Sequence, residues 1–144
     1  APEVPTGDGT SFDAPLPAGT EIELTEEGES VWKVQVTGVN WDGGDQSWGT
    51  SSAGAYAVVE LKVTNTSPAP KDPYMTIWFG MTDLEGNEYS EAMVVSDNDL
   101  VSVDNVEPGE SATGEILFEV PEGINQGILY FSTWDTEDTF VVAN

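Results

Sequence analysis

Residues 31–39 read VWKVQVTGV, and residues 55–63 read AYAVVELKV. In the first stretch Trp32, Val34 and Val36 alternate with polar residues, and in the second the odd-numbered positions from 57 to 63 are apolar. Successive side chains of a β-strand point to opposite faces, so this alternation predicts two strands that each bury one face. A polar second face is typical of antiparallel sheets with one side in water.

Further short segments of the same kind follow along the chain, separated by turn residues such as Pro, Gly and Asn. We expect Met75, Ile77, Phe79 and Met81 to point inward together, and Leu117 to point away from the core. No stretch shows an extended helical stripe. The pattern predicts an immunoglobulin-like antiparallel β-sandwich of seven to eight strands. Besides the two stretches above, the predicted strands are Met75–Met81, Thr113–Val120, Gly127–Thr133 and Thr139–Ala143, with weaker candidates at Glu21–Leu24 and Tyr89–Val95.

Three segments of the chain resemble a known family. Residues 63–66 read VTNT, residues 83–89 read DLEGNEY, and residues 108–121 read PGESATGEILFEVP. They resemble the immunoglobulin-like domain of bacterial exported proteins related to the mycobacterial immunoprotective extracellular protein. That domain recurs in actinobacterial surface lipoproteins and is largely of unknown function. The resemblance covers residues 20–143; it implies the sandwich fold and transfers no catalytic residue.

The sequence is strongly acidic. It contains 27 aspartate and glutamate residues against three lysines, Lys33, Lys62 and Lys71, and its formal net charge is −24. Nucleic-acid binding needs cationic side chains that neutralise phosphates, and an anionic membrane repels such a surface, so we exclude both as partners. Cations, basic proteins and neutral sugars remain compatible with this charge, and so does a purely solubilising role of the acidic side chains.

The residue types of most active sites are missing from the chain. Without histidine or cysteine there is no ordinary general base near neutral pH and no thiol nucleophile. Only a lysine is left to activate a serine, and the three lysines are scattered. Pairs of carboxylates can catalyse glycoside cleavage, but among 27 acidic residues such pairs arise by chance, so they do not indicate an active site. We therefore predict that the chain is not an enzyme.

Composition divides the chain into two parts. Residues 1–19 contain four of the nine prolines and three glycines, which predicts a flexible linker, whereas residues 20–144 form the sandwich domain. The first residues have neither a basic region nor an apolar stretch, so we expect that a signal peptide has already been removed. Many members of the resembling family are tethered by a lipidated cysteine ahead of such a linker. The predicted location is therefore extracytoplasmic, either secreted or lipid-anchored at the cell surface.

Asp97, Asp99 and Asp104 form a candidate calcium site, with Asn98 beside them in a predicted loop. Their spacing matches the start of an EF-hand loop, but the glycine and the terminal glutamate that such a loop requires are missing. Solvation of an ordinary acidic surface is the competing interpretation. Apart from calcium we expect no cofactor.

A second candidate site is aromatic. Trp41 and Trp48 flank a glycine-rich loop that also contains Asp42 and Asp45, and Trp78 faces away from its apolar neighbours. Exposed tryptophans stack on sugar rings or anchor protein interfaces. Packing of Trp41 in the core and of Trp78 under a loop are the competing interpretations.

Together these patterns predict a non-enzymatic module that acts in protein–protein interaction or as a structural element. Its partner is an unknown protein or a cell-wall component. The alternative is a ligand-binding module, for glycans through the tryptophans or for calcium through the acidic loops.

Overall fold

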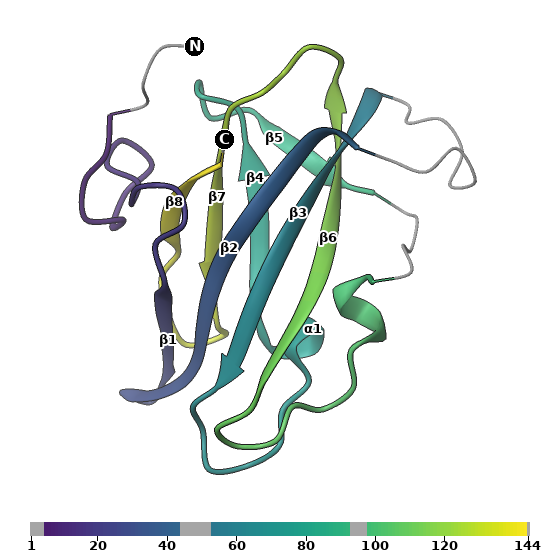
Figure 1. The fold of residues 1–144 in the computed structure, drawn as a ribbon. Helices are drawn as coiled ribbons and strands as arrows, with labels where there is room; N and C mark the ends of the chain where they lie inside the picture. Colours follow the sequence, from purple (N-terminus) through teal and green to yellow (C-terminus); the bar gives the residue numbers. More distant parts are fainter. Residues whose placement is uncertain (1–4, 44–52, 93–97, 144) are drawn as a thin grey trace.

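The computed structural model describes residues 5–43, 53–92 and 98–143. Within them the chain forms eight strands, one short α-helix and one 3-10 helix (Figure 1). No helix of the described residues is long and apolar enough to cross a membrane. The elements are β1 (Ile22–Glu26), β2 (Glu29–Gly43), β3 (Gly54–Asn65), α1 (Pro73–Thr76), β4 (Trp78–Thr82), β5 (Glu88–Glu91), η2 (Leu100–Ser102), β6 (Ser111–Pro121), β7 (Gly127–Ser132) and β8 (Thr139–Ala143).

The strands pack as two layers. Their hydrogen-bonded order is β1-β2-β3-β6-β5-β4-β7-β8, and every pair of neighbouring strands is antiparallel. β5 pairs with β6 on one side and with β4 on the other, so it connects the long layer (β1, β2, β3 and β6) to the short layer (β4, β7 and β8). Figure 1 shows β2, β3 and β6 in front of β4 and β7. The predicted antiparallel sandwich is confirmed.

The core lies between the two layers and is built by the predicted alternation. Trp32, Val34 and Val36 of β2 are all buried, as the sequence predicts. The short layer contributes Met81 and Phe131 to the same cluster. Burial of apolar surface stabilises the fold by about 25 cal/mol per Å². The apolar contacts of this shared cluster are therefore the main interaction between the two layers.

The outer face of the long layer differs from the prediction at Leu117. This residue was expected to face water, but it is buried in a second small cluster with Tyr56, Val58 and Ala92. The chain continues alongside β6 after β5 ends, and the Ala92 amide donates a hydrogen bond to the Leu117 carbonyl at 2.8 Å. Ala92 therefore covers the side chain of Leu117. The predicted outward position of Leu117 is therefore wrong.

The predicted strand Met75–Met81 begins with a helical turn instead. Asp72 caps α1 by accepting a hydrogen bond from the Met75 amide at 3.2 Å, and Pro73 occupies the first turn. Met75 is consequently 72% exposed, so its predicted inward position is wrong, whereas Ile77 and Met81 are buried as expected. The two weaker candidates correspond to β1 and β5 with shifted bounds, and residues 93–95 of the second candidate lie outside the described residues.

The segment before β1 is attached to the short layer, which differs from the free linker that its composition predicts. Leu16 forms a parallel bridge with Val141. The Phe140 amide donates to the Gly9 carbonyl at 2.9 Å, and the Val142 amide donates to the Leu16 carbonyl at the same distance. These bonds cover the edge of β8, where an unpaired strand invites aggregation. Figure 1 shows this segment beside β8.

The turn between β1 and β2 contains a strained glutamate. Glu27 has a φ of 52°, and Gly28 follows it at 82°. Positive φ at both central residues is the geometry of a type I′ hairpin, which prefers Asn-Gly. Changing Glu27 to asparagine should therefore raise the free energy of unfolding by about 0.5–1 kcal/mol, as measured by urea denaturation. Glu29→Asn removes the same charge without relieving strain, and an equal gain there would contradict this explanation.

Candidate functional site

The predicted calcium ligands do not form a cluster in the part of the chain that is described. Asp97 lies outside the described residues. The Asp99 carboxylate is buried and caps η2, where it accepts a hydrogen bond from the Val101 amide at 3.0 Å, and Asp104 is exposed. No group of three or more acidic, histidine or cysteine residues suited to a metal ion occurs among the described residues. Calcium binding stays a prediction.

The predicted aromatic loop is described only at its start, where residues 41–43 form the end of β2. Asp45 and Trp48 lie outside the described residues, as does the side chain of Asp42. Trp41 is half-buried and packs against the main core, with its ring close to Gly127. Its indole nitrogen has no hydrogen-bond partner among the described residues. Trp41 therefore packs against the core and does not form part of an open surface.

Trp78 is placed where the sequence predicts it, facing away from the core. It is 58% exposed, while its neighbour Ile77 is buried. The register pairs Trp78 with Ser132 and Gly80 with Tyr130, and it pairs Tyr130 with Phe140. Alternation then puts Trp78, Tyr130 and Phe140 together on the outer face of the short layer.

Tyr130 is fixed on this face by the absence of a side chain at Gly80. A Cβ atom at Gly80 would lie only 2.1 Å from the Tyr130 hydroxyl oxygen, so the tyrosine ring extends across β4. Its hydroxyl donates a hydrogen bond to Glu88 Oε1 of β5 at 2.8 Å. The ring also packs against Phe140, with a centroid distance of 5.9 Å. Three strands thus hold one aromatic side chain in place.

Burial, together with the hydrogen bond to Glu88 and the charges of Glu88 and Asp138, raises the pKa of Tyr130 from 10.0 to about 12. The stabilising effect of the protonated phenol is present below pH 10.0 and is lost as the pH rises toward about 12. Asp138 directly precedes β8 and is two residues from Phe140, so its charge lies near this face.

Changing Gly80 to alanine tests this packing. The new methyl group must displace the Tyr130 ring from Glu88, so the pKa of Tyr130 should fall from about 12 toward 10.0. Ultraviolet titration of the tyrosines, compared with Tyr130→Phe, measures this shift. Gly38→Ala is the control, because a Cβ atom there meets only the Glu60 carboxylate, at 3.3 Å. An unchanged pKa of Tyr130 in the Gly80 variant would contradict the arrangement.

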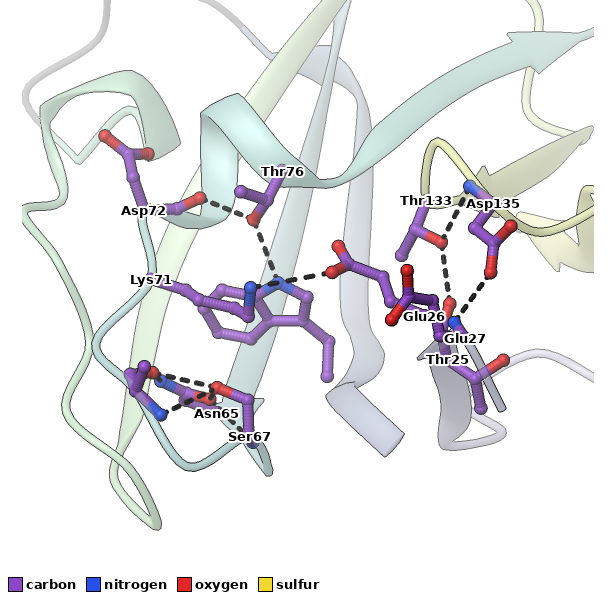
Figure 2. A network of polar contacts seen from close by, with 12 residues as sticks. Thr25, Glu26, Glu27, Asn65, Ser67, Lys71, Asp72, Thr76, Thr133 and Asp135 are labelled. Atoms are coloured by element: carbon purple, nitrogen blue, oxygen red, sulfur yellow. Dashed lines mark hydrogen bonds and ion pairs between the residues drawn. The ribbon is translucent and has the colours of Figure 1, made fainter. Parts of the chain in front are cut away.

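Trp134 lies in the loop that follows β7 and is 59% exposed. The residues on both sides of it are anchored (Figure 2). The buried Thr133 hydroxyl donates to the Thr25 carbonyl at 2.7 Å, and the Thr133 amide donates to Thr136 Oγ1 at 2.8 Å. On the other side, Asp135 Oδ2 accepts a hydrogen bond from the Glu27 amide at 2.6 Å. The loop therefore presents the Trp134 indole from a fixed backbone.

A second polar network holds the helix α1, which leads into Trp78 at the start of β4. The helix α1 comes directly before β4, and its Thr76 hydroxyl donates to the Asp72 carbonyl at 2.6 Å. The same hydroxyl oxygen accepts a hydrogen bond from the Trp32 indole at 2.9 Å (Figure 2). Because Trp78 pairs with Ser132, two residues before Trp134, the two exposed indoles mark one end of the layer.

We call this region the Trp78–Trp134 surface; it consists of Trp78, Tyr130, Trp134 and Phe140. The sequence singled out only Trp78. The register that brings Tyr130 and Phe140 beside it depends on pairing between distant strands, which no local pattern reveals. Trp134 did leave a signal, since it is a tryptophan inside the polar loop WDTED of residues 134–138, where burial is improbable.

Comparisons with known proteins agree with this architecture. The secreted protein MPT63 of Mycobacterium tuberculosis aligns with a TM-score of 0.66 and 19% identity, over 90% of this chain and 97% of that one. An uncharacterised β-sandwich protein of Clostridium difficile aligns with a TM-score of 0.55 and 12% identity, over 99% of this chain and 97% of that one. These likenesses confirm the immunoglobulin-like β-sandwich fold.

A predicted lipoprotein of Bacillus subtilis, ycdA, aligns with a TM-score of 0.54 and 18% identity, over 88% of this chain. The chain spans 38% of the length of that protein. No curated protein matches the sequence. A family model described as a domain of unknown function (DUF4352) matches residues 17–139. The match covers most of the sequence, so this chain belongs to the DUF4352 family.

Proposed function

We propose that this protein is a non-enzymatic extracytoplasmic module that binds another protein through the Trp78–Trp134 surface. The observation that supports it most strongly is the pair of exposed indoles on a fixed frame, Trp78 at 58% and Trp134 at 59% exposure. Tryptophan is enriched among the residues that dominate binding energy at protein interfaces. An indole whose backbone is already anchored loses little conformational freedom when a partner binds it.

Two further observations support the non-enzymatic and extracytoplasmic parts of the proposal. The chain has no histidine and no cysteine, so it lacks the usual general base near neutral pH and a thiol nucleophile. Proteins of the same fold include a secreted protein and a predicted lipoprotein.

The proposal is tested by retention of proteins from a cell-surface extract of the organism that makes this chain. The immobilised wild-type protein should retain a partner, and the double variant Trp78→Ala/Trp134→Ala should retain it more than about tenfold more weakly. Leu84→Ala is the matched control, because Leu84 is also an exposed apolar residue, at 43%, but follows the opposite end of β4. Equal retention by the wild type and the double variant would overturn the proposal.

Digestion of the extract with a protease separates the protein partner from a glycan. A protein partner is lost on digestion, whereas a polysaccharide that stacks on the same indoles survives it. If material is still retained after complete digestion, the surface binds a glycan, and the proposed protein–protein interaction is contradicted.

A further inference from the structure

We infer that the partner of the Trp78–Trp134 surface presents a cationic, arginine- or lysine-rich polypeptide segment. This inference rests on the proposed function and specifies its partner. It follows from the charges around the indoles, from the distribution of the lysines and from the rigidity of the loop after β7.

Carboxylates border the aromatic side chains of this surface. Asp135, Glu137 and Asp138 follow Trp134 directly in the chain, and all three are exposed. Glu88 lies at the other side of Tyr130, whose hydroxyl it binds at 2.8 Å. A surface that combines flat aromatic faces with carboxylates matches the guanidinium group of arginine, which stacks on rings and pairs with carboxylates.

None of the three lysines belongs to the short layer or to the loop that follows β7. β4, β5, β7, β8 and the loop of residues 133–138 contain no lysine or arginine. Lys33 lies on the long layer within 3.9 Å of Glu21, and Lys71 lies within 3.6 Å of Glu26. Lys62 also belongs to the long layer, in β3. Lys71 lies close to the loop that carries Trp134, but its ammonium group already pairs with Glu26 (Figure 2). The strands and the loop that carry the surface contribute no cation of their own, so its charge complements a cationic partner.

The fixed geometry favours a specific contact over diffuse attraction. The hydrogen bond between the Glu27 amide and Asp135 joins the loop after β7 to the turn before β2, and Thr133 joins it to β1. The acidic loop and its indole are thus ordered before a partner arrives. The overall charge of −24 accelerates the approach of a cationic chain, while the aromatic faces provide the local contact that a solvated acidic surface lacks.

The probe is an oligoarginine peptide, titrated into the folded protein by isothermal calorimetry with indole fluorescence as a second readout. The double variant Glu137→Gln/Asp138→Asn removes two charges beside Trp134. Its matched control, Glu85→Gln/Glu122→Gln, removes two exposed charges at the opposite end of the domain. Trp134→Ala removes the indole alone. Each of these side chains is exposed, so the variants should fold, which circular dichroism verifies.

We expect the first double variant and Trp134→Ala each to weaken oligoarginine binding on the order of tenfold, and the control double variant to weaken it less than about twofold. Binding should also weaken with added salt, because the Debye length shrinks from about 10 Å at 0.1 M to about 3 Å at 1 M. Equal weakening in both double variants would show attraction by net charge alone and overturn the inference, as would undiminished binding by Trp134→Ala.

Failure of this inference is distinguishable from failure of the proposed function. In one outcome, retention from the surface extract depends on Trp78 and Trp134, but oligoarginine binding does not depend on Glu137 and Asp138. That outcome supports the interaction surface and rejects a cationic partner. If neither retention depends on the two tryptophans nor oligoarginine binding on the two carboxylates, the interaction surface itself is rejected.

Discussion

Changing Asn65 to aspartate is expected to lower the free energy of unfolding by about 3–5 kcal/mol at neutral pH, the range for an uncompensated buried charge. Asn65 is 0% exposed. Its side-chain nitrogen donates to the Ala69 carbonyl at 2.8 Å and to the Val106 carbonyl at 2.7 Å. Its oxygen accepts from the Ser67 amide at 2.8 Å. A carboxylate at this position cannot donate and faces two carbonyl oxygens instead.

The pH dependence of this variant provides an internal check. Burial raises the pKa of the introduced carboxyl above its unfolded value, so the loss of stability should shrink as the pH falls through the raised pKa. Urea denaturation at neutral and acidic pH, monitored by tryptophan fluorescence, measures the difference. Asn105→Asp makes the same chemical change at an exposed residue and should stay within about 0.5 kcal/mol of the wild type. Equal effects at both sites would contradict the structural role of Asn65.

Changing Trp32 to alanine is expected to lower the free energy of unfolding by about 3–5 kcal/mol, as for other buried aromatic residues. Trp32 is 0% exposed, and its indole donates to Thr76 Oγ1 at 2.9 Å. The variant therefore loses a large core side chain and also the bond that supports α1 ahead of Trp78. Chemical denaturation followed by far-ultraviolet circular dichroism measures the loss.

Two controls separate the contributions at Trp32. Trp134→Ala removes an equally large side chain from the surface, and its effect on stability should stay within about 0.5 kcal/mol. Thr76→Val keeps the shape of the side chain but leaves the indole N–H without its acceptor, which costs about 1–3 kcal/mol. A Trp32→Ala effect no larger than that of Trp134→Ala would contradict the assignment of Trp32 to the core.

The fold was predictable because the inward faces of its main strands show a period of two. β2 buries Trp32, Val34 and Val36 on one face, and this period of two is visible in the sequence without any knowledge of the partners. Prediction failed where another segment covers the second face, as at Leu117, whose outer side is closed by the chain after β5. It also failed at Met75, although Asp72-Pro73 is a recognisable helix start.

The candidate surface was much less predictable than the fold. The exposed Trp78 followed from alternation, but the position of Tyr130 depends on a missing side chain at Gly80, which lies 50 positions earlier in the numbering. The backbone around Trp134 is fixed by hydrogen bonds to Thr25 and Glu27. Each bond joins residues that are 108 positions apart in the sequence. Such long-range pairings are fixed by the topology and not by any local composition.

The most direct test of the interaction surface uses the indole N–H signals of the isotope-labelled protein in two-dimensional NMR, before and after addition of the unlabelled surface extract. Five tryptophans give five candidate signals, which single substitutions assign. We predict that the signals of Trp78 and Trp134 shift or broaden while that of the buried Trp32 stays in place. Binding that leaves both Trp78 and Trp134 unperturbed would contradict the account.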